Sequence, residues 1–194
     1  IGCGTCVTLT RTGGEPEVKA MKTDLAEKGK LVTGNTVVPV ACDNLTREFL
    51  SDFGEQIDQE DTLLVMTCAF GVQSIARQLK KMVIPALDTL FIGKETSFGT
   101  FDEICTQCGT CIIGETGGIC PVTRCAKSIF NGPCGGSVEG ACEVDKEVKC
   151  GWQMIIDRLK SLDQMDNYGK LKPYKGWDAS RDGGPRRIIR EDMK

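Results

Sequence analysis

The apolar positions of the first hundred residues follow two periods, one typical of helices and one typical of buried strands. Residues 15–29 place Val18, Met21 and Leu25 on one face, which predicts an amphipathic helix. Residues 62–67 (TLLVMT) form a nearly continuous apolar run, as in a strand that is covered on both faces. The chain therefore begins by alternating helices with buried strands.

Further elements repeat this alternation. Residues 37–41 (VVPVA) predict a strand, which Pro39 places at the edge of a sheet because proline lacks an N–H donor. The other expected elements are helices at 43–53 and 72–79 and a strand at 87–92. This order predicts an α/β domain over residues 1–98, built on a small doubly wound parallel sheet.

The rest of the chain divides into two further parts. Residues 99–150 are rich in cysteine and glycine and lack long apolar runs, so we expect a module that is organised by metal. Residues 151–194 begin with the clearest amphipathic helix of the chain and end in a polar tail. We expect the tail to lie extended on a partner subunit; the alternative is a disordered end.

Net charge excludes two classes of partner. The chain has 24 basic and 27 acidic residues and a net charge of −3, so no overall field draws it to nucleic acid. No apolar run approaches the roughly 20 residues of a membrane span. We therefore expect neither nucleic acid nor membrane as a partner.

The number of cysteines gives the strongest indication of the chemistry of this chain. The chain has twelve cysteines and no histidine, so any metal must be held mainly by thiolate. This favours iron–sulfur clusters or all-cysteine zinc, argues against a hydrolytic metal site, and indicates a reducing, cytoplasmic location. The alternative is a secreted protein with six disulfides. Ile1 and Gly2 look like the end of a strand that starts earlier, so we expect missing N-terminal residues.

Four cysteines follow the three predicted strands in the same way. Cys3 and Cys6 form a C-x2-C pair after the first strand, Cys42 follows the second, and Cys68 follows the third. Because the carboxyl ends of parallel strands share one edge, we expect these four thiols to converge on a 4Fe–4S cluster. The alternatives are that Cys42 and Cys68 are ordinary buried cysteines, or that Cys3 and Cys6 form a redox-active pair.

A second cluster is predicted by the run CTQCGTC. Cys105, Cys108 and Cys111 repeat at C-x2-C-x2-C spacing, as in the bacterial ferredoxin run that fills three corners of a 4Fe–4S cube. Cys120 is the first choice for the fourth ligand, and Cys125 and Cys150 are also open at this stage.

The remaining thiols predict a third metal site. They belong to Cys125, Cys134, Cys142 and Cys150, and none is in a C-x2-C pair. The site could hold a structural zinc or a third cluster. Free structural thiols are the alternative. Near the clusters, we expect the amides of Gly109, Gly135 and Gly136 to approach sulfur and tune the metal.

Motifs for other chemistries are absent. No G-x-G-x-x-G sequence opens a helix after a strand, and no phosphate-binding loop of the Walker type is present. Without histidine, neither serine nor cysteine has the usual base to activate it. These absences favour a subunit that carries electrons and performs no catalysis of its own.

The cysteine pattern resembles a known family. The run from Cys105 to Val144, followed by Cys150-Gly-Trp152, is similar to the C-terminal domain of bacterial methylenetetrahydrofolate reductase, which acetogens also use as a small free subunit. The segments IGCGTC, VACD and MTCAFGVQ are similar to the same subunit. The resemblance implies an iron–sulfur and zinc subunit whose partner is a flavin-bearing catalytic subunit that reduces methylene- to methyl-tetrahydrofolate.

The combined expectation is an electron-transfer subunit of the acetyl-CoA (Wood–Ljungdahl) pathway. Two 4Fe–4S clusters, with zinc or a third cluster beside them, would relay electrons to or from the flavin of the catalytic subunit. The external donor would be ferredoxin or a further electron-donor subunit. The alternative from another class is a structural scaffold that binds zinc only.

Overall fold

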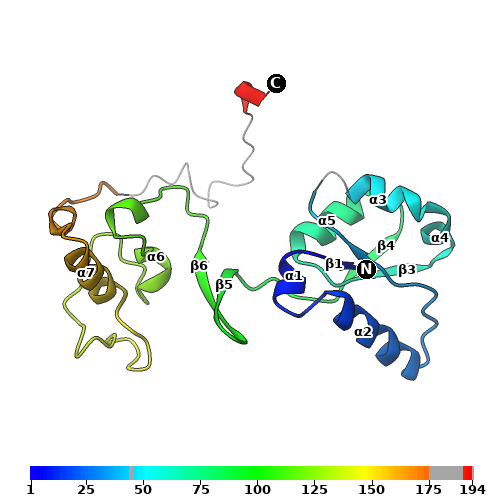
Figure 1. The fold of residues 1–194 in the computed structure, drawn as a ribbon, viewed down its shortest axis with the longest axis horizontal. Helices are drawn as coiled ribbons and strands as arrows, with labels where there is room; N and C mark the ends of the chain where they lie inside the picture. Colours follow the sequence, from blue (N-terminus) through cyan, green and yellow to red (C-terminus); the bar gives the residue numbers. More distant parts are fainter. Residues whose placement is uncertain (44–45, 175–189, 194) are drawn as a thin grey trace. The chain divides into compact units, whose positions relative to one another are not determined.

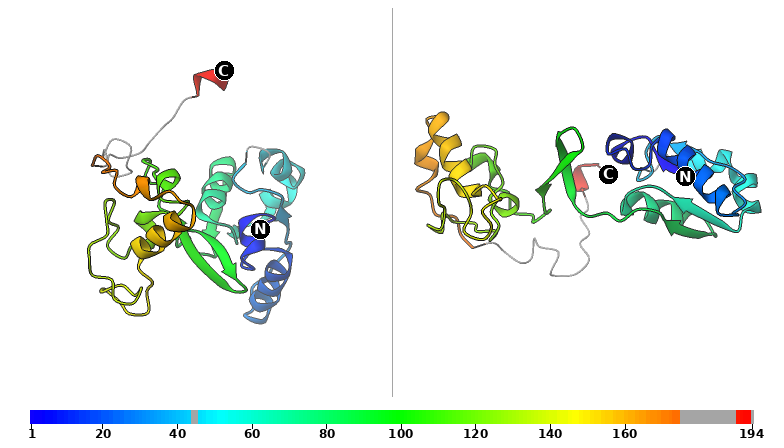
Figure 2. Two further views of the ribbon diagram at one scale, coloured as in Figure 1. Left: turned by 60° about the vertical axis from the view of Figure 1, so that its left-hand side comes forward. Right: turned by 90° about the horizontal axis from the view of Figure 1, so that it is seen from below.

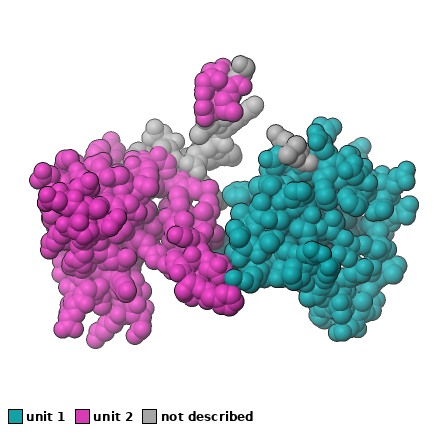
Figure 3. All heavy atoms as spheres, viewed as in Figure 1, with its two compact units in different colours: residues 1–90 teal, residues 91–194 magenta. Residues whose placement is uncertain are grey.

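The computed structural model describes residues 1–43, 46–174 and 190–193, and its elements are labelled in Figure 1. It divides into two compact units, residues 1–90 and residues 91–194, which are coloured separately in Figure 3. Each unit has a hydrophobic core of its own.

Short parallel strands form the centre of the first unit. They are β1 (Gly2–Cys3), β2 (Val37–Val38), β3 (Thr62–Val65) and β4 (Met82–Pro85). β1 pairs with β2, and β3 pairs with β4. Ile1 connects the two pairs, because its amino group donates to Leu64 O at 2.7 Å and its carbonyl accepts from Met66 N–H at 2.7 Å. The carboxyl ends of β1, β2 and β3 therefore lie along one edge.

Helices flank these strands on both sides in Figure 1, with α2 on one side and α3, α4 and α5 on the other. The helices are α1 (Cys6–Leu9), α2 (Glu15–Glu27), α3 (Thr46–Asp52), α4 (Gly54–Gln59) and α5 (Ala69–Gln78). At the start of α2, the Glu17 carboxylate accepts a hydrogen bond from Gly14 N–H at 2.9 Å, and Pro16 lies in the first turn. The expected helix at 15–29 is thus confirmed, and the helix expected at 43–53 corresponds to α3, after which α4 begins as a separate helix at Gly54.

The core of the first unit lies between the strands and α5. Val38, Val65 and Ile75 are completely buried in it. Each such side chain stabilises the fold by about 1.5–3 kcal/mol relative to an exposed one. Asn44 and Leu45, which were expected to begin the helix after β2, lie outside the described residues.

The expected doubly wound parallel sheet is corrected by the structure. The protein is mixed α/β, but among the residues that the structure describes the strands form three sheets of two strands each, and one of these sheets is antiparallel. β2 has only two residues, Val37 and Val38. Pro39 follows at once and cannot donate to a ladder, which accounts for the short strand.

The strand expected at 87–92 is also wrong. The strand after α5 is β4, five residues earlier, and it is followed by a loop. In that loop Thr89 Oγ1 accepts a hydrogen bond from Ala69 N–H at 2.8 Å, at the start of α5. Leu90 is 84 % exposed. The apolar residues that suggested a strand therefore belong to the loop after β4. This loop is hydrogen-bonded to the first residue of α5.

The second unit begins with an antiparallel hairpin that the sequence pattern did not predict. Its strands are β5 (Ile92–Ser97) and β6 (Thr100–Cys105), which Figure 2 shows side by side in both views. Gly99, at the tip, has a φ of 75°, which glycine adopts without strain. The domain boundary expected between residues 98 and 99 falls at this tip, whereas the compact units divide at residue 90.

After the hairpin, the described residues of this unit form several short helices and one longer helix, which are connected by loops. They are η1 (Ile113–Glu115), α6 (Pro121–Arg124), α7 (Gly151–Ser161), η2 (Met165–Asn167) and η5 (Glu191–Met193). α7 confirms the helix expected after Cys150. Its Trp152, Ile155 and Leu159 form the core of the unit, together with Ile119 and Ile129. Most of the expected partner-binding tail, residues 175–189, lies outside the described residues.

Candidate metal centres

Four thiols gather at the strand edge of the first unit. Cys3 ends β1, Cys6 opens α1, Cys42 follows β2, and Cys68 precedes α5. Partial desolvation of the otherwise exposed Cys42 sulfur, followed by the negative charges of Cys68, Cys3 and Cys6, raises the pKa of Cys42. Thiols act on one another in this way only at short range, so the structure brings the four predicted ligands of the first site into one neighbourhood.

Two hydrogen bonds orient Cys3 within this group. Its sulfur accepts from the backbone N–H of Ala41 at 3.3 Å and lies 3.1 Å from Thr5 Oγ1. Cys3 is buried, whereas Cys6 and Cys42 are exposed and Cys68 is half-buried. The group is therefore anchored in the core by one sulfur and accessible to solvent at the others.

The second predicted site lies where the hairpin ends. Cys105 is the last residue of β6, and its sulfur accepts from Gln107 N–H at 3.3 Å. Gln107 and Gly109 both have positive φ values, 55° and 82°, so the chain turns tightly between Cys105 and Cys108. This turn brings a backbone N–H to sulfur, but the donor is Gln107 and not the expected Gly109.

Cys120 is held near Cys105 through the elements that carry them. Cys120 immediately precedes α6, and Thr123 in α6 donates from Oγ1 to Ile104 O at 3.4 Å. Ile104 is the residue before Cys105. Within the part of the chain that the structure describes, no comparable hydrogen bond links Cys111 to Cys105 or Cys120. Cys111 is exposed.

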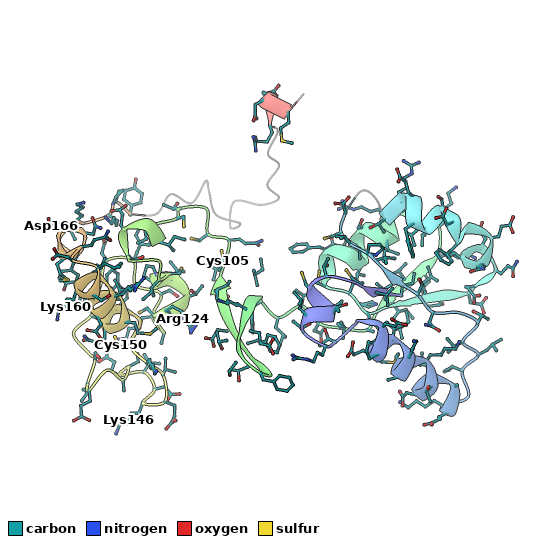
Figure 4. All side chains as sticks on the ribbon, in the orientation of Figure 1. Cys105, Arg124, Lys146, Cys150, Lys160 and Asp166 are labelled. Carbon is teal, nitrogen blue, oxygen red and sulfur yellow. The ribbon has the colours of Figure 1, made fainter. Side chains whose placement is uncertain are left out.

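The third predicted site is a single small cavity. Cys125, Cys134, Cys142 and Cys150 all line it, and its free volume is about 10 Å³. In Figure 4, Cys150 lies at the start of α7. These four cysteines are separated by up to 25 residues in the chain, yet they line the same cavity. None of them belongs to a C-x2-C pair.

Lys127 and Glu143 stand beside Cys134 at the rim of this cavity. Lys127 Nζ forms an ion pair with the Glu143 carboxylate and lies 3.8 Å from Cys134 Sγ. Gly136 N–H donates to Cys134 Sγ at 3.4 Å, as expected from the glycines around this cysteine. The hydrogen bond from Gly136 and the charge of Lys127 lower the pKa of Cys134.

The donor chemistry of these groups suits thiolate-bound metal. All twelve cysteines lie within the described residues, and none of them forms a disulfide. Among those residues, no three His, Cys, Asp or Glu side chains stand close enough together to hold a metal ion as they are placed. The three groups nevertheless offer soft sulfur donors, each with a backbone N–H directed at one sulfur, as iron–sulfur and zinc–thiolate centres require.

Sequence reasoning missed the side chains and amides that support the thiols. Ala41 and Gln107 donate to sulfur through the backbone, and no residue pattern marks such a donor. Arg124, which fastens α6 to β6, was also missed. No spacing pattern marks it, because its partners Glu103 and Asp102 lie 21 and 22 residues away in the chain.

Within the described residues, every helix is too short or too polar to cross a bilayer.

Comparison with known proteins finds one family model that matches part of the chain. Residues 84–178 match the family model described as the C-terminal part of methylene-tetrahydrofolate reductase. The matched range is just under half of the chain and contains eight of its twelve cysteines. No curated protein and no solved structure matches the chain. The match supports a relationship between this protein and methylenetetrahydrofolate reductase, and it associates the cysteine-rich unit with that enzyme's C-terminal domain.

Proposed function

We propose that this chain is an electron-transfer subunit of a methylenetetrahydrofolate reductase complex. It would relay electrons through 4Fe–4S clusters to or from the flavin of the catalytic subunit, in the acetyl-CoA (Wood–Ljungdahl) pathway. The observation that carries the proposal is that Cys3, Cys6 and Cys68, which follow two other strands of the same edge, all lie near enough to Cys42 to act on it electrostatically. Thiols from three separate segments of the chain commonly lie together when they bind the same metal centre.

The first cluster would be held by these four residues. A 4Fe–4S cluster accepts and returns single electrons, and its potential depends on charge, hydrogen bonds to sulfur and exposure. The hydrogen bond from Ala41 to Cys3 would orient this sulfur toward the cluster. Exposure of Cys6 and Cys42 leaves one side of the site open to an electron partner.

The second cluster would use Cys105, Cys108, Cys111 and Cys120. The cavity of the third site supports this choice of fourth ligand, because Cys125 and Cys150 both line that cavity and Cys120 does not. Cys120 also precedes the helix that is bonded to the end of β6, where Cys105 stands.

The third site would be a structural zinc. Its cavity of about 10 Å³ has room for roughly one atom of water size, which suits a single ion better than an iron–sulfur cube. Four thiolates around one ion form the closed, all-cysteine arrangement of structural zinc. Zinc there would fasten α6 and α7 to the loop between them.

The proposal also names the partners of this chain and its location in the cell. The catalytic subunit would carry the flavin, and ferredoxin or another subunit would supply electrons. The tail would contact the catalytic subunit: residues 170–194 contain eight basic and four acidic side chains, in contrast to the acidic remainder of the chain. A cytoplasmic location fits twelve reduced thiols.

The proposal is tested by direct electron transfer. The anaerobically purified chain is reduced, freed of reductant, and mixed with the oxidised flavin-bearing catalytic subunit in a stopped-flow instrument. We expect the absorbance of oxidised flavin to fall while the chain is reoxidised. If the chain is colourless, holds only zinc and leaves the flavin oxidised, it is a scaffold, and the proposal is wrong.

A further inference from the structure

Asn131 holds the backbone of the second unit at Lys172, shortly after η2, in which Figure 4 labels Asp166. Its Nδ2 donates to the carbonyl of Lys172 at 2.8 Å, and its Oδ1 accepts from the N–H of Lys172 at 2.9 Å. One side-chain amide thus satisfies both backbone groups of a residue 41 positions away, as a neighbouring strand would do. The backbone is therefore fixed here, although no helix or strand includes residues 171–174.

An ion pair holds the same residue through its side chain. Lys172 Nζ pairs with the carboxylate of Glu115, which ends η1, and the Lys172 side chain is only 12 % exposed. Lys172 also lines a small cavity together with Trp152 and Ile155, two core residues of α7. The backbone and the side chain of Lys172 are thus both held against the core of the unit.

The apolar side chains on either side of Lys172 lie in solvent. Leu171 is 87 % exposed and Tyr174 is 89 % exposed. Burial is therefore inverted in this segment, because lysine is seldom buried and large apolar side chains gain free energy by leaving water. A fixed backbone that displays apolar side chains suits a binding surface, since little conformational entropy is lost when a partner covers them.

The family match and the charge of the chain indicate which partner covers this segment. The matched range ends at residue 178, so it includes all of residues 171–174, and it belongs to the C-terminal part of methylene-tetrahydrofolate reductase. A surface of that domain has the rest of the same enzyme as its first candidate partner. Residues 170–194 carry eight basic and four acidic side chains, so the matching surface of the partner would be apolar with an acidic rim.

We propose that residues 171–174 are a preformed docking segment for the flavin-bearing catalytic subunit. Leu171 and Tyr174 are its contact residues, and Asn131 is a positioning residue that holds them in place. The inference rests on the proposed function, which supplies the partner, and it does not depend on which metal each group of cysteines binds.

The experiment measures the Kd between the full chain and the flavin-bearing catalytic subunit by anaerobic biolayer interferometry. Leu171→Ser and Tyr174→Ser remove the apolar contacts, and Asn131→Ala removes both hydrogen bonds to Lys172. Leu31→Ser is the matched control, because Leu31 is 90 % exposed but belongs to the first unit. Hydrogen exchange over residues 168–174 of the free chain measures separately whether the segment is preformed.

The contact residues and the positioning residue should give different results. We expect Leu171→Ser and Tyr174→Ser each to raise the Kd about tenfold, as loss of an anchor residue does. Asn131→Ala should raise it about threefold, because the partner must then order the segment, and exchange over residues 168–174 should become faster while that of α7 does not change. Leu31→Ser should bind like the parent. If Asn131→Ala fails to fold, the two exposed residues decide.

Three results would overturn the inference. The first is binding as tight as that of the parent in either Leu171→Ser or Tyr174→Ser. The second is exchange over residues 168–174 of the parent that is as fast as in an unstructured peptide. The third is a dimer of the free chain that Leu171→Ser converts to a monomer, which would assign the segment to self-association. If the parent does not bind the catalytic subunit at all, the proposed function itself has failed, and the inference with it.

Discussion

The backbone N–H of Ala41 points at the sulfur of Cys3, 3.3 Å away, although 38 residues separate them in the chain. The bond connects the end of β1 to the segment that follows β2, one residue before Cys42. It therefore fixes two of the four predicted ligands of the first site relative to each other. Thiolates in iron–sulfur proteins commonly accept such N–H bonds, which favour their charged form.

Replacement of one ligand in each unit should remove one cluster and leave the other. Cys68→Ser takes a thiolate from the first site, and Cys105→Ser takes one from the second, while each unit keeps its own core. We expect each variant to lose about four irons per chain and one resonance signal. Iron analysis and electron paramagnetic resonance of anaerobic samples measure this. Loss of both signals in either variant would mean that the units do not load independently.

Gly13→Ala should destabilise the first unit. Gly13 is buried, its carbonyl accepts from Cys3 N–H at 3.0 Å, and an added methyl group would overlap Met66 O. Overpacking of this kind costs about 1–3 kcal/mol. Urea unfolding followed by circular dichroism measures it, with Gly34→Ala as the control because nothing lies within 4 Å of its added methyl group. Equal stability of the two variants would contradict the packing described.

Trp152→Phe should weaken the core of the second unit. Trp152 is 7 % exposed, and its Nε1 donates to Ile129 O at 2.9 Å. Phenylalanine cannot donate, so a partly buried carbonyl loses its partner at a cost of about 1 kcal/mol. The same unfolding measurement applies, with Tyr174→Phe as the control since Tyr174 is 89 % exposed. A loss of stability in the control as large as that in Trp152→Phe would refute the assignment.

Cys134 and Cys42 should react differently with iodoacetamide in metal-free protein. Only thiolate reacts, so a lowered pKa brings the rise in rate to lower pH and a raised pKa moves it to higher pH. The hydrogen bond from Gly136 and the charge of Lys127 lower the pKa of Cys134 from 9.0, whereas partial desolvation and neighbouring thiolates raise the pKa of Cys42 from the same value. Peptide mass spectrometry across a pH series should find Cys134 modified first near neutral pH.

The cause of the Cys134 shift can be checked in the same assay. Lys127→Gln removes the cation but leaves the Gly136 N–H, so the pH of half-maximal rate at Cys134 should rise only part of the way towards 9.0. The rate at Cys42 should not change. Identical pH profiles for the two cysteines in the unaltered chain would show that these local interactions are too weak to matter.

The periodic parts of the chain were predictable because local packing determines them. The helical face of Trp152, Ile155 and Leu159 became the core of the second unit, as its spacing indicates. Strand topology accounts for the fact that Cys3 and Cys68 both act electrostatically on Cys42, because the strands that precede them end at one edge. Joint binding of one cluster by these thiols stays a prediction.

Other parts could not be predicted because long-range contacts determine them. Leu90 and Ile92 look like strand residues, but the first lies in a loop and the second begins an antiparallel hairpin. β2 stops after two residues, so the apolar pattern overstates the extent of the sheet. The bonds from Arg124 to β6 join residues that are far apart in the sequence, and nothing in their spacing reveals them.

Iron, acid-labile sulfide and zinc in the anaerobically purified full chain test the central claim most directly. Two 4Fe–4S clusters and one structural zinc require about eight irons, eight sulfides and one zinc per chain. We expect these values, with a brown colour that fades on reduction. A colourless protein with fewer than about four irons per chain, or one whose thiols are paired in disulfides, would contradict the account.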